Sequence, residues 1–136
     1  MLMDTIKQLD SAGPTTNVSG DTVGGSVYDI AGSTLSQPTG AAVLMRFSVT
    51  HAFSFAASMA GSFAESEVAA TGSPVYILKK NGTQFATLTF SGNAGTFGDM
   101  AATVSFVQGD ILTLVAPATA DATHDEIAWT LAGTLV

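Results

Sequence analysis

Short apolar runs alternate with turn-forming residues from Ser26 to the C-terminus of this chain. A period of two between apolar and polar positions predicts β-strands, because successive side chains of a strand point to opposite faces. Gly, Pro, Asn and Asp separate the runs and mark turns. Strands are predicted within Val27–Ile30, Ala42–Val49, Ala52–Ala57, Pro74–Lys80, Thr83–Phe90, Ala102–Val107, Ile111–Ala116 and Glu126–Leu135, with loops at Ser91–Asp99 and Pro117–Asp125.

The strongest local signal is a β-hairpin in Pro74–Phe90, centred on Asn81-Gly82. This dipeptide suits a two-residue type I′ turn, which needs positive φ at both central residues. The turn would place Lys80 opposite Thr83. Further along, the predicted pairs are Ile77 with Ala86 and Val75 with Leu88.

The two faces of this hairpin differ in the role we expect for them. One face is a candidate core and carries Val75, Ile77, Ala86, Leu88 and Phe90. The other carries Tyr76, Leu78 and Phe85, which are more large apolar groups than a solvated face usually holds. We therefore expect this second face to lie against another subunit or against a second layer of the same subunit.

The segment Ser62–Ala70 is ambiguous, because its Glu and Ala favour a helix while its alternation fits an edge strand. Its neighbours favour the strand. About eight short strands in one chain predict an all-β fold, a single antiparallel β-sandwich of jelly-roll type over residues 26–136. Residues 1–25 form a separate N-terminal arm, either a disordered tail or an extended segment that orders against a neighbouring subunit.

Composition narrows the function. The chain has 136 residues, of which only 11% are charged, and a net charge of −7. Four basic residues are too few for a phosphate backbone or an anionic membrane, so neither nucleic acid nor membrane is an expected partner. There is no cysteine and no apolar N-terminal run. We expect a protein that is made and kept in the cytosol, or that leaves it by a route that needs no signal peptide.

Candidate chemistry is sparse, and we expect neither enzymatic activity nor a cofactor or metal. Glu65 and Glu67 would share a strand face about 7 Å apart, but their neighbours are too small to hold a sugar. The run His124-Asp125-Glu126 cannot converge on one metal from a strand, and a solvated loop end explains it better. The turn positions of three aspartates predict hydrogen bonds to their own backbone: Asp99, Asp110 and Asp121.

Arg46 is the only arginine, and it lies in an otherwise apolar strand. It either faces solvent beside Leu44 and Ser48 or pairs with an acid of the same or a neighbouring subunit, because a buried unpaired charge is too costly.

Several motifs resemble small β-sandwich structural proteins of tailed-bacteriophage virions. They cover about residues 42–134 and comprise Leu78-Lys79-Lys80-Asn81-Gly82-Thr83, Gly109-Asp110-Ile111-Leu112-Thr113, Ala116–Thr123, Ile127–Thr134, Ala60-Gly61-Ser62 and Ala69–Ser73. In that family the module often ends a longer tail or fibre polypeptide. Here it makes up nearly the whole sequence, with a short arm before it.

The resemblance implies a homo-oligomeric (dimeric or trimeric) capsid decoration, or cement, protein on the virion surface, made in the host cytoplasm. Its partner would be the major capsid protein, whose neighbouring subunits it bridges. The interface residues we expect are Tyr76, Leu78, Phe85 and Arg46. The alternative is a tail or fibre component that binds the host surface through loops Ser91–Asp99 and Pro117–Asp125.

Overall fold

A computed structural model describes residues 26–136, and these residues form one antiparallel sheet. The predicted all-β class is confirmed, with ten strands where about eight were expected. The jelly-roll topology stays a prediction. The predicted arm at residues 1–25 lies outside the described residues and also stays a prediction. The strands are β1 (Val27–Ser33), β2 (Val43–Ser48), β3 (Phe53–Phe55), β4 (Phe63–Val68), β5 (Val75–Lys80), β6 (Thr83–Ser91), β7 (Ala94–Gly98), β8 (Val104–Phe106), β9 (Ile111–Val115) and β10 (Asp125–Leu135).

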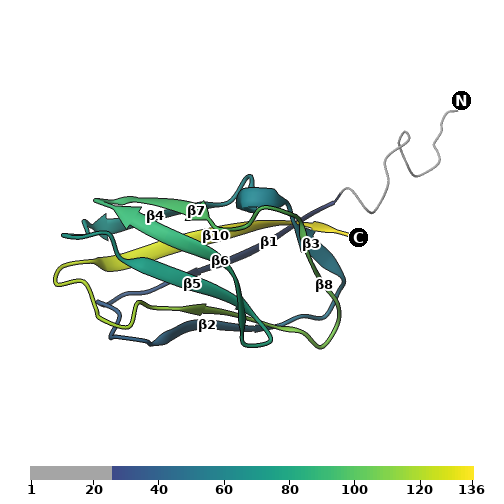
Figure 1. Ribbon diagram of the computed structural model, residues 1–136, viewed down its shortest axis with the longest axis horizontal. Coiled ribbons are helices and arrows are strands. Elements are labelled where there is room, and N and C mark those ends of the chain that lie inside the picture. Colours follow the sequence, from purple (N-terminus) through teal and green to yellow (C-terminus); the bar gives the residue numbers. More distant parts are fainter. Residues whose placement is uncertain (1–25) are drawn as a thin grey trace, which may run out of the picture.

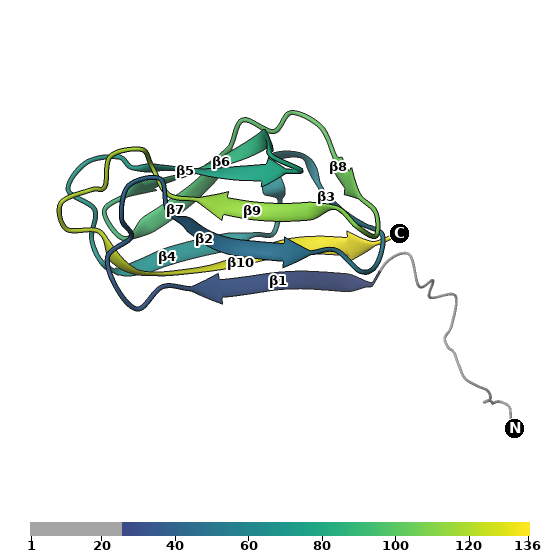
Figure 2. The ribbon, with the colours of Figure 1, turned by 90° about the horizontal axis from the view of Figure 1, so that it is seen from below.

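The sheet order is β2-β9-β5-β6-β7-β4-β10-β3-β8, and β1 pairs with the other edge of β10. The long strand β10 pairs with β4 along its first half and with β3 near its end. The sheet curls over, so that β5, β6 and β9 face β1, β10 and β4 across the core (Figures 1 and 2). Side chains from both halves are fully buried between them, including Leu78, Leu88 and Leu114 on one side and Ile127 and Leu131 on the other.

The hairpin turn has the predicted geometry. Asn81 and Gly82 have φ angles of 51° and 83°, and Lys80 pairs with Thr83. Beyond the turn the predicted register is wrong. Leu78 pairs with Ala86 and Tyr76 with Leu88, because Phe85 is an extra residue that forms a β-bulge.

Because of this bulge, the residues of β5 that share a face with Ala86 and Leu88 are Leu78 and Tyr76, not Ile77 and Val75. Tyr76 and Leu78 point into the core, where 2% and 0% of their surface is exposed. Val75 and Ile77, which were predicted to be core residues, lie on the outer face instead. The second layer that covers Tyr76 and Leu78 therefore belongs to the same subunit.

Two other segments bear on the secondary-structure predictions. Ser62–Ala70 contains strand β4, which confirms the strand over the helix. Ser91–Asp99 is not an open loop, because it contains β7, which pairs with β6 along its whole length.

The ring of Trp129 lies across β1 at Gly32 and determines which residue type can occupy that position. A Cβ at Gly32 would lie 2.6 Å from Cζ2 of Trp129, so only glycine fits opposite the indole.

Among the described residues there is no α-helix, and hence none long and apolar enough to span a membrane.

Candidate functional site

One end of the domain holds both the start of β1 and the end of β10, and we call it the terminal end (Figure 1). The hairpin tip at Asn81 lies at the same end, beside the turn that joins β8 to β9. Three valines are exposed there: Val27 at 74%, Val107 at 60% and Val136 at 76%. Other large apolar side chains are exposed elsewhere, among them Leu35, Phe63 and Val43, but three at one end make this end a candidate contact surface.

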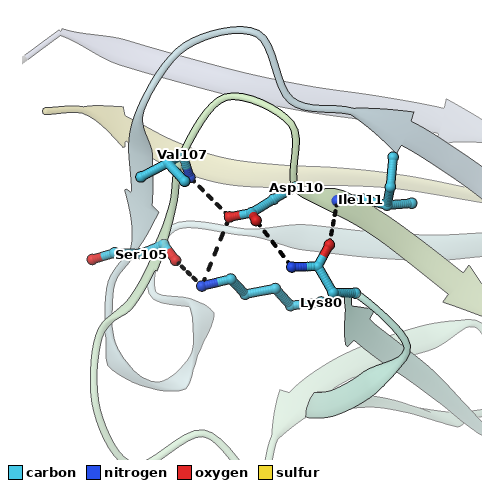
Figure 3. Close-up of polar contacts among 6 residues, drawn as sticks. Lys80, Ser105, Val107, Asp110 and Ile111 are labelled. Carbon is cyan, nitrogen blue, oxygen red and sulfur yellow. Dashed lines mark hydrogen bonds and ion pairs between the residues drawn. The ribbon is translucent and has the colours of Figure 1, made fainter.

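A network of polar contacts ties the hairpin tip to the β8–β9 turn (Figure 3). The Asn81 side chain donates to the Asp110 carboxylate at 2.9 Å and accepts from the Ile111 N–H at 2.8 Å. The second carboxylate oxygen of Asp110 accepts from the Val107 N–H at 2.9 Å. Two loops that are distant in sequence are therefore held as one unit.

Lys80 completes this network from the inner side of β5. Its ammonium donates to the Ser105 carbonyl at 2.6 Å and lies 3.8 Å from the Asp110 carboxylate (Figure 3). It also lies 5.3 Å from the centre of the Phe106 ring, within cation–π range. The hydrogen bonds from Asn81 and Val107, with the charge of Lys80, hold the pKa of Asp110 below its usual range.

The opposite end is organised by Asp121. Its carboxylate accepts from the N–H groups of Thr71 at 3.0 Å and Gly72 at 2.8 Å. It also accepts from the N–H groups of Thr123 and His124, each at 3.1 Å. The bond to Thr123, two residues on, confirms the predicted turn for Asp121. Together these bonds hold the pKa of Asp121 far below its usual range, the donors at Thr71 and Gly72 contributing most.

His124 is buried, which corrects the prediction of a solvated loop end. Its Nδ1 lies 2.8 Å from the Tyr76 hydroxyl, and its ring packs on Phe90. Burial lowers the pKa of His124, so the neutral ring is favoured. Burial, with the nearby Asp121 carboxylate, raises the pKa of Tyr76 to about 12. This pair is a polar contact inside the core, away from the surface.

Because the Asp121 carboxylate is favoured in the folded state, it stabilises the fold above the unfolded pKa of about 3.9. That contribution is lost as the pH falls from about 4 towards the lower folded pKa. We expect Asp121→Asn to have a lower urea midpoint than the wild type at pH 7. The difference between the two midpoints should become smaller as the pH falls from 4 to 2. Urea unfolding of both proteins across this range measures the effect; a constant difference would contradict it.

The predicted interface residues do not come together. Tyr76 and Leu78 are in the core, so their assignment to an outward contact surface is wrong. Phe85 is half-buried and stacks on Phe55 with ring centres 6.1 Å apart. Arg46 is exposed on β2, beside Ser48 as the solvent-facing interpretation expects. Its pairing with an acid stays a prediction.

Other predicted positions have simpler outcomes. Glu65 and Glu67 are both exposed on the same face of β4, as the alternation predicts. His51 is exposed, with its Nδ1 3.0 Å from the Thr50 hydroxyl. Asp99 accepts from the Thr87 hydroxyl at 3.4 Å, not from its own backbone. Within residues 26–136, no three acidic or histidine side chains are grouped as metal ligands.

The sequence analysis did not identify the three exposed valines as contact residues, because each is a single apolar residue at the end of a predicted strand or of the chain. The available signal was positional: Val107 directly precedes the Gln108-Gly109-Asp110 turn, and Val136 ends the chain.

The fold places the chain in the broad class of all-β proteins with one antiparallel sheet. Neither a protein-family model, nor a curated protein sequence, nor a solved structure matches it.

Proposed function

We propose that this protein is a structural component of a phage virion, a capsid decoration protein that binds the outside of the shell and bridges major capsid subunits. The observation that carries the proposal is the terminal end, where Val27, Val107 and Val136 are exposed around a braced hairpin tip. The motifs that resemble those of virion β-sandwich proteins, including this hairpin, support the same assignment.

The three valines supply apolar area for such a contact. Fully burying a valine side chain contributes about 1.5–3 kcal/mol, so three of them can account for a substantial part of a protein–protein affinity. This estimate is an upper value, because ordering the interface costs free energy.

The braced tip lowers that ordering cost. The contacts of Lys80 and Asn81 with Asp110 restrict the β8–β9 turn that carries Val107 before any partner arrives. A rigid surface loses less conformational entropy on binding than a free loop. The terminal end therefore combines apolar area with preorganisation, as a cementing contact requires.

The alternative, a tail or fibre component that binds the host surface, was based on two loops. Strand β7 occupies one of them, Ser91–Asp99. Asp121 holds the other, Pro117–Asp125, against Thr71 and Gly72. The terminal end supports the decoration role better than these loops support receptor binding.

We expect Val107→Asp to weaken binding to empty capsids of the phage that encodes the protein by at least about tenfold, because an unpaired carboxylate would be desolvated at the contact. Co-sedimentation with the capsids measures this. The matched control is Leu35→Asp, since Leu35 is 88% exposed but lies beyond β1, at the opposite end.

Leu35→Asp should bind like the wild type. Equal binding by Val107→Asp would overturn the proposed contact. Density for the protein only at the tail in electron cryo-microscopy of the virion would overturn the decoration role itself.

A further inference from the structure

The charged residues of the described strands are divided between the two halves of the sheet. Within residues 26–136, every Lys and Arg lies on β2 or β5: Arg46, Lys79 and Lys80. The acids that lie within strands are all on β1, β4 or β10: Asp29, Glu65, Glu67, Asp125 and Glu126. Lys80 lies on the inner side of β5 and pairs with Asp110, so the outer face of β2 and β5 carries Arg46 and Lys79. Its charge is opposite to that of the outer face of β1, β4 and β10.

The first of these surfaces is the outer face of β2, β9 and β5, which we call the Arg46 face. Arg46 pairs with Thr113, and Thr113 pairs with Lys79, so the two basic side chains flank a threonine in one cross-strand row. The next row is apolar and consists of Val43, Val115 and Ile77. Val43 is 59% exposed.

The second surface is the outer face of β1, β10 and β4, which we call the Phe63 face. Phe63, 66% exposed, lies in a row with small side chains, since it pairs with Thr130 and Thr130 pairs with Ala31. Glu65 lies in the next row, with Ala128 and Ser33. A large exposed aromatic ring thus stands among small side chains, with a carboxylate in the next row.

On each of the two faces, an apolar side chain and a charged side chain of one strand are separated by the same distance. On β4, Phe63 and Glu65 are two residues apart on one face, about 7 Å. On β5, Ile77 and Lys79 are also two residues apart on one face, about 7 Å. The phenyl ring of one copy can therefore lie on the apolar row of another while its carboxylate meets a basic side chain.

We propose that copies of this chain associate head to tail, with the Phe63 face of one copy packed on the Arg46 face of the next. Opposite charges at the two faces favour this arrangement, whereas pairing either face with itself would bring like charges together. Both faces lie along the length of the strands, so this contact does not use the terminal end. The inference goes beyond the proposed function and does not require it.

Charge reversal tests the proposal with the full chain. Arg46→Glu with Lys79→Glu makes both faces acidic. Glu65→Lys with Glu67→Lys replaces the two acids that β4 contributes to the Phe63 face with bases, so that these positions repel the basic Arg46 face. Each double variant alone should associate at least about tenfold more weakly than the wild type in sedimentation velocity experiments. An equimolar mixture of the two should associate again, because every contact between unlike variants joins opposite charges.

The mixture also controls for folding, since a misfolded variant could not restore association. The matched control is Thr83→Glu with Gln108→Glu, which adds two acids at the terminal end and should associate like the wild type. Association of the wild type should weaken as NaCl rises from 0.1 to 1 M, because the screening length falls from about 10 Å to about 3 Å.

Three results would overturn the proposal: a wild type that stays monomeric at every concentration, an Arg46→Glu/Lys79→Glu variant that associates like the wild type, or a mixture that does not associate. Capsid binding is measured separately. A monomeric protein that binds capsids would overturn only the head-to-tail contact, and a self-associating protein that does not bind them would overturn only the decoration role.

Discussion

Replacement of Leu78 by aspartate is expected to prevent folding, whereas the same replacement at Val75 leaves the fold intact. Leu78 is fully buried and pairs with Ala86 and Leu114 on neighbouring strands. The variant loses the packing of a core leucine, about 2–5 kcal/mol, and buries a carboxylate without a partner. Together these costs are comparable to the whole stability of a typical domain, about 5–15 kcal/mol.

Val75 is the matched control, because it lies three residues away on the same strand but on the outer face, with 38% of its surface exposed. Val75→Asp should cost about 1 kcal/mol, the scale of β-propensity differences. Circular dichroism and urea unfolding of the two purified variants measure the contrast. If Val75→Asp unfolds the protein and Leu78→Asp does not, the register of the hairpin is wrong.

That contrast also shows how far the sequence predicts this hairpin. Asn81-Gly82 predicts the turn because its φ requirements are local. The bulge at Phe85 is not local, since the ring of this residue stacks on Phe55 of β3 and packs on Phe106 of β8. One extra residue reverses every side chain beyond it, and a period-two pattern contains no sign of it.

The buried position of His124 was also not predicted. Once Tyr76 points inward, its hydroxyl needs a buried partner, and the His124 ring supplies one. The prediction for His124 rested on its position in a polar loop, and that loop contains no sign of the buried Tyr76 hydroxyl.

Strand β7 was missed for a different reason. Its sequence, Ala94–Gly98, contains two glycines and little that favours a strand. The segment is extended because β6 offers it a full row of backbone partners. Tertiary pairing thus overrides local propensity, which only the folded chain reveals.

The sequence alone also does not predict which charged residues lie together on the Arg46 face and on the Phe63 face. Arg46 and Lys79 are 33 positions apart, and strand β9, later in the chain than both, lies between their strands. Strand order therefore creates the Arg46 face. What the sequence does predict is that Glu65 and Glu67 share one face, because that depends on a single strand.

Phe106→Ala is expected to destabilise the protein by about 3–5 kcal/mol, the cost of removing a fully buried phenylalanine. Phe106 is at the centre of the aromatic core, with its ring stacked on Phe53 at 4.8 Å. It also packs edge-on against Phe55 and Phe85, each at 5.6 Å between ring centres. Strand β8 has only three residues, so few other contacts can compensate.

The loss should extend to the terminal end, because Lys80 lies over the same ring. Phe106→Leu keeps much of the volume but not the ring stacking, and it should cost about 1–1.5 kcal/mol. Phe63→Ala removes the same side chain from an exposed strand position and should change stability by no more than about 0.5 kcal/mol. Urea unfolding in dilute solution compares the three variants. A loss below about 1 kcal/mol for Phe106→Ala would mean that the aromatic core is not what holds β8 and the braced tip in place.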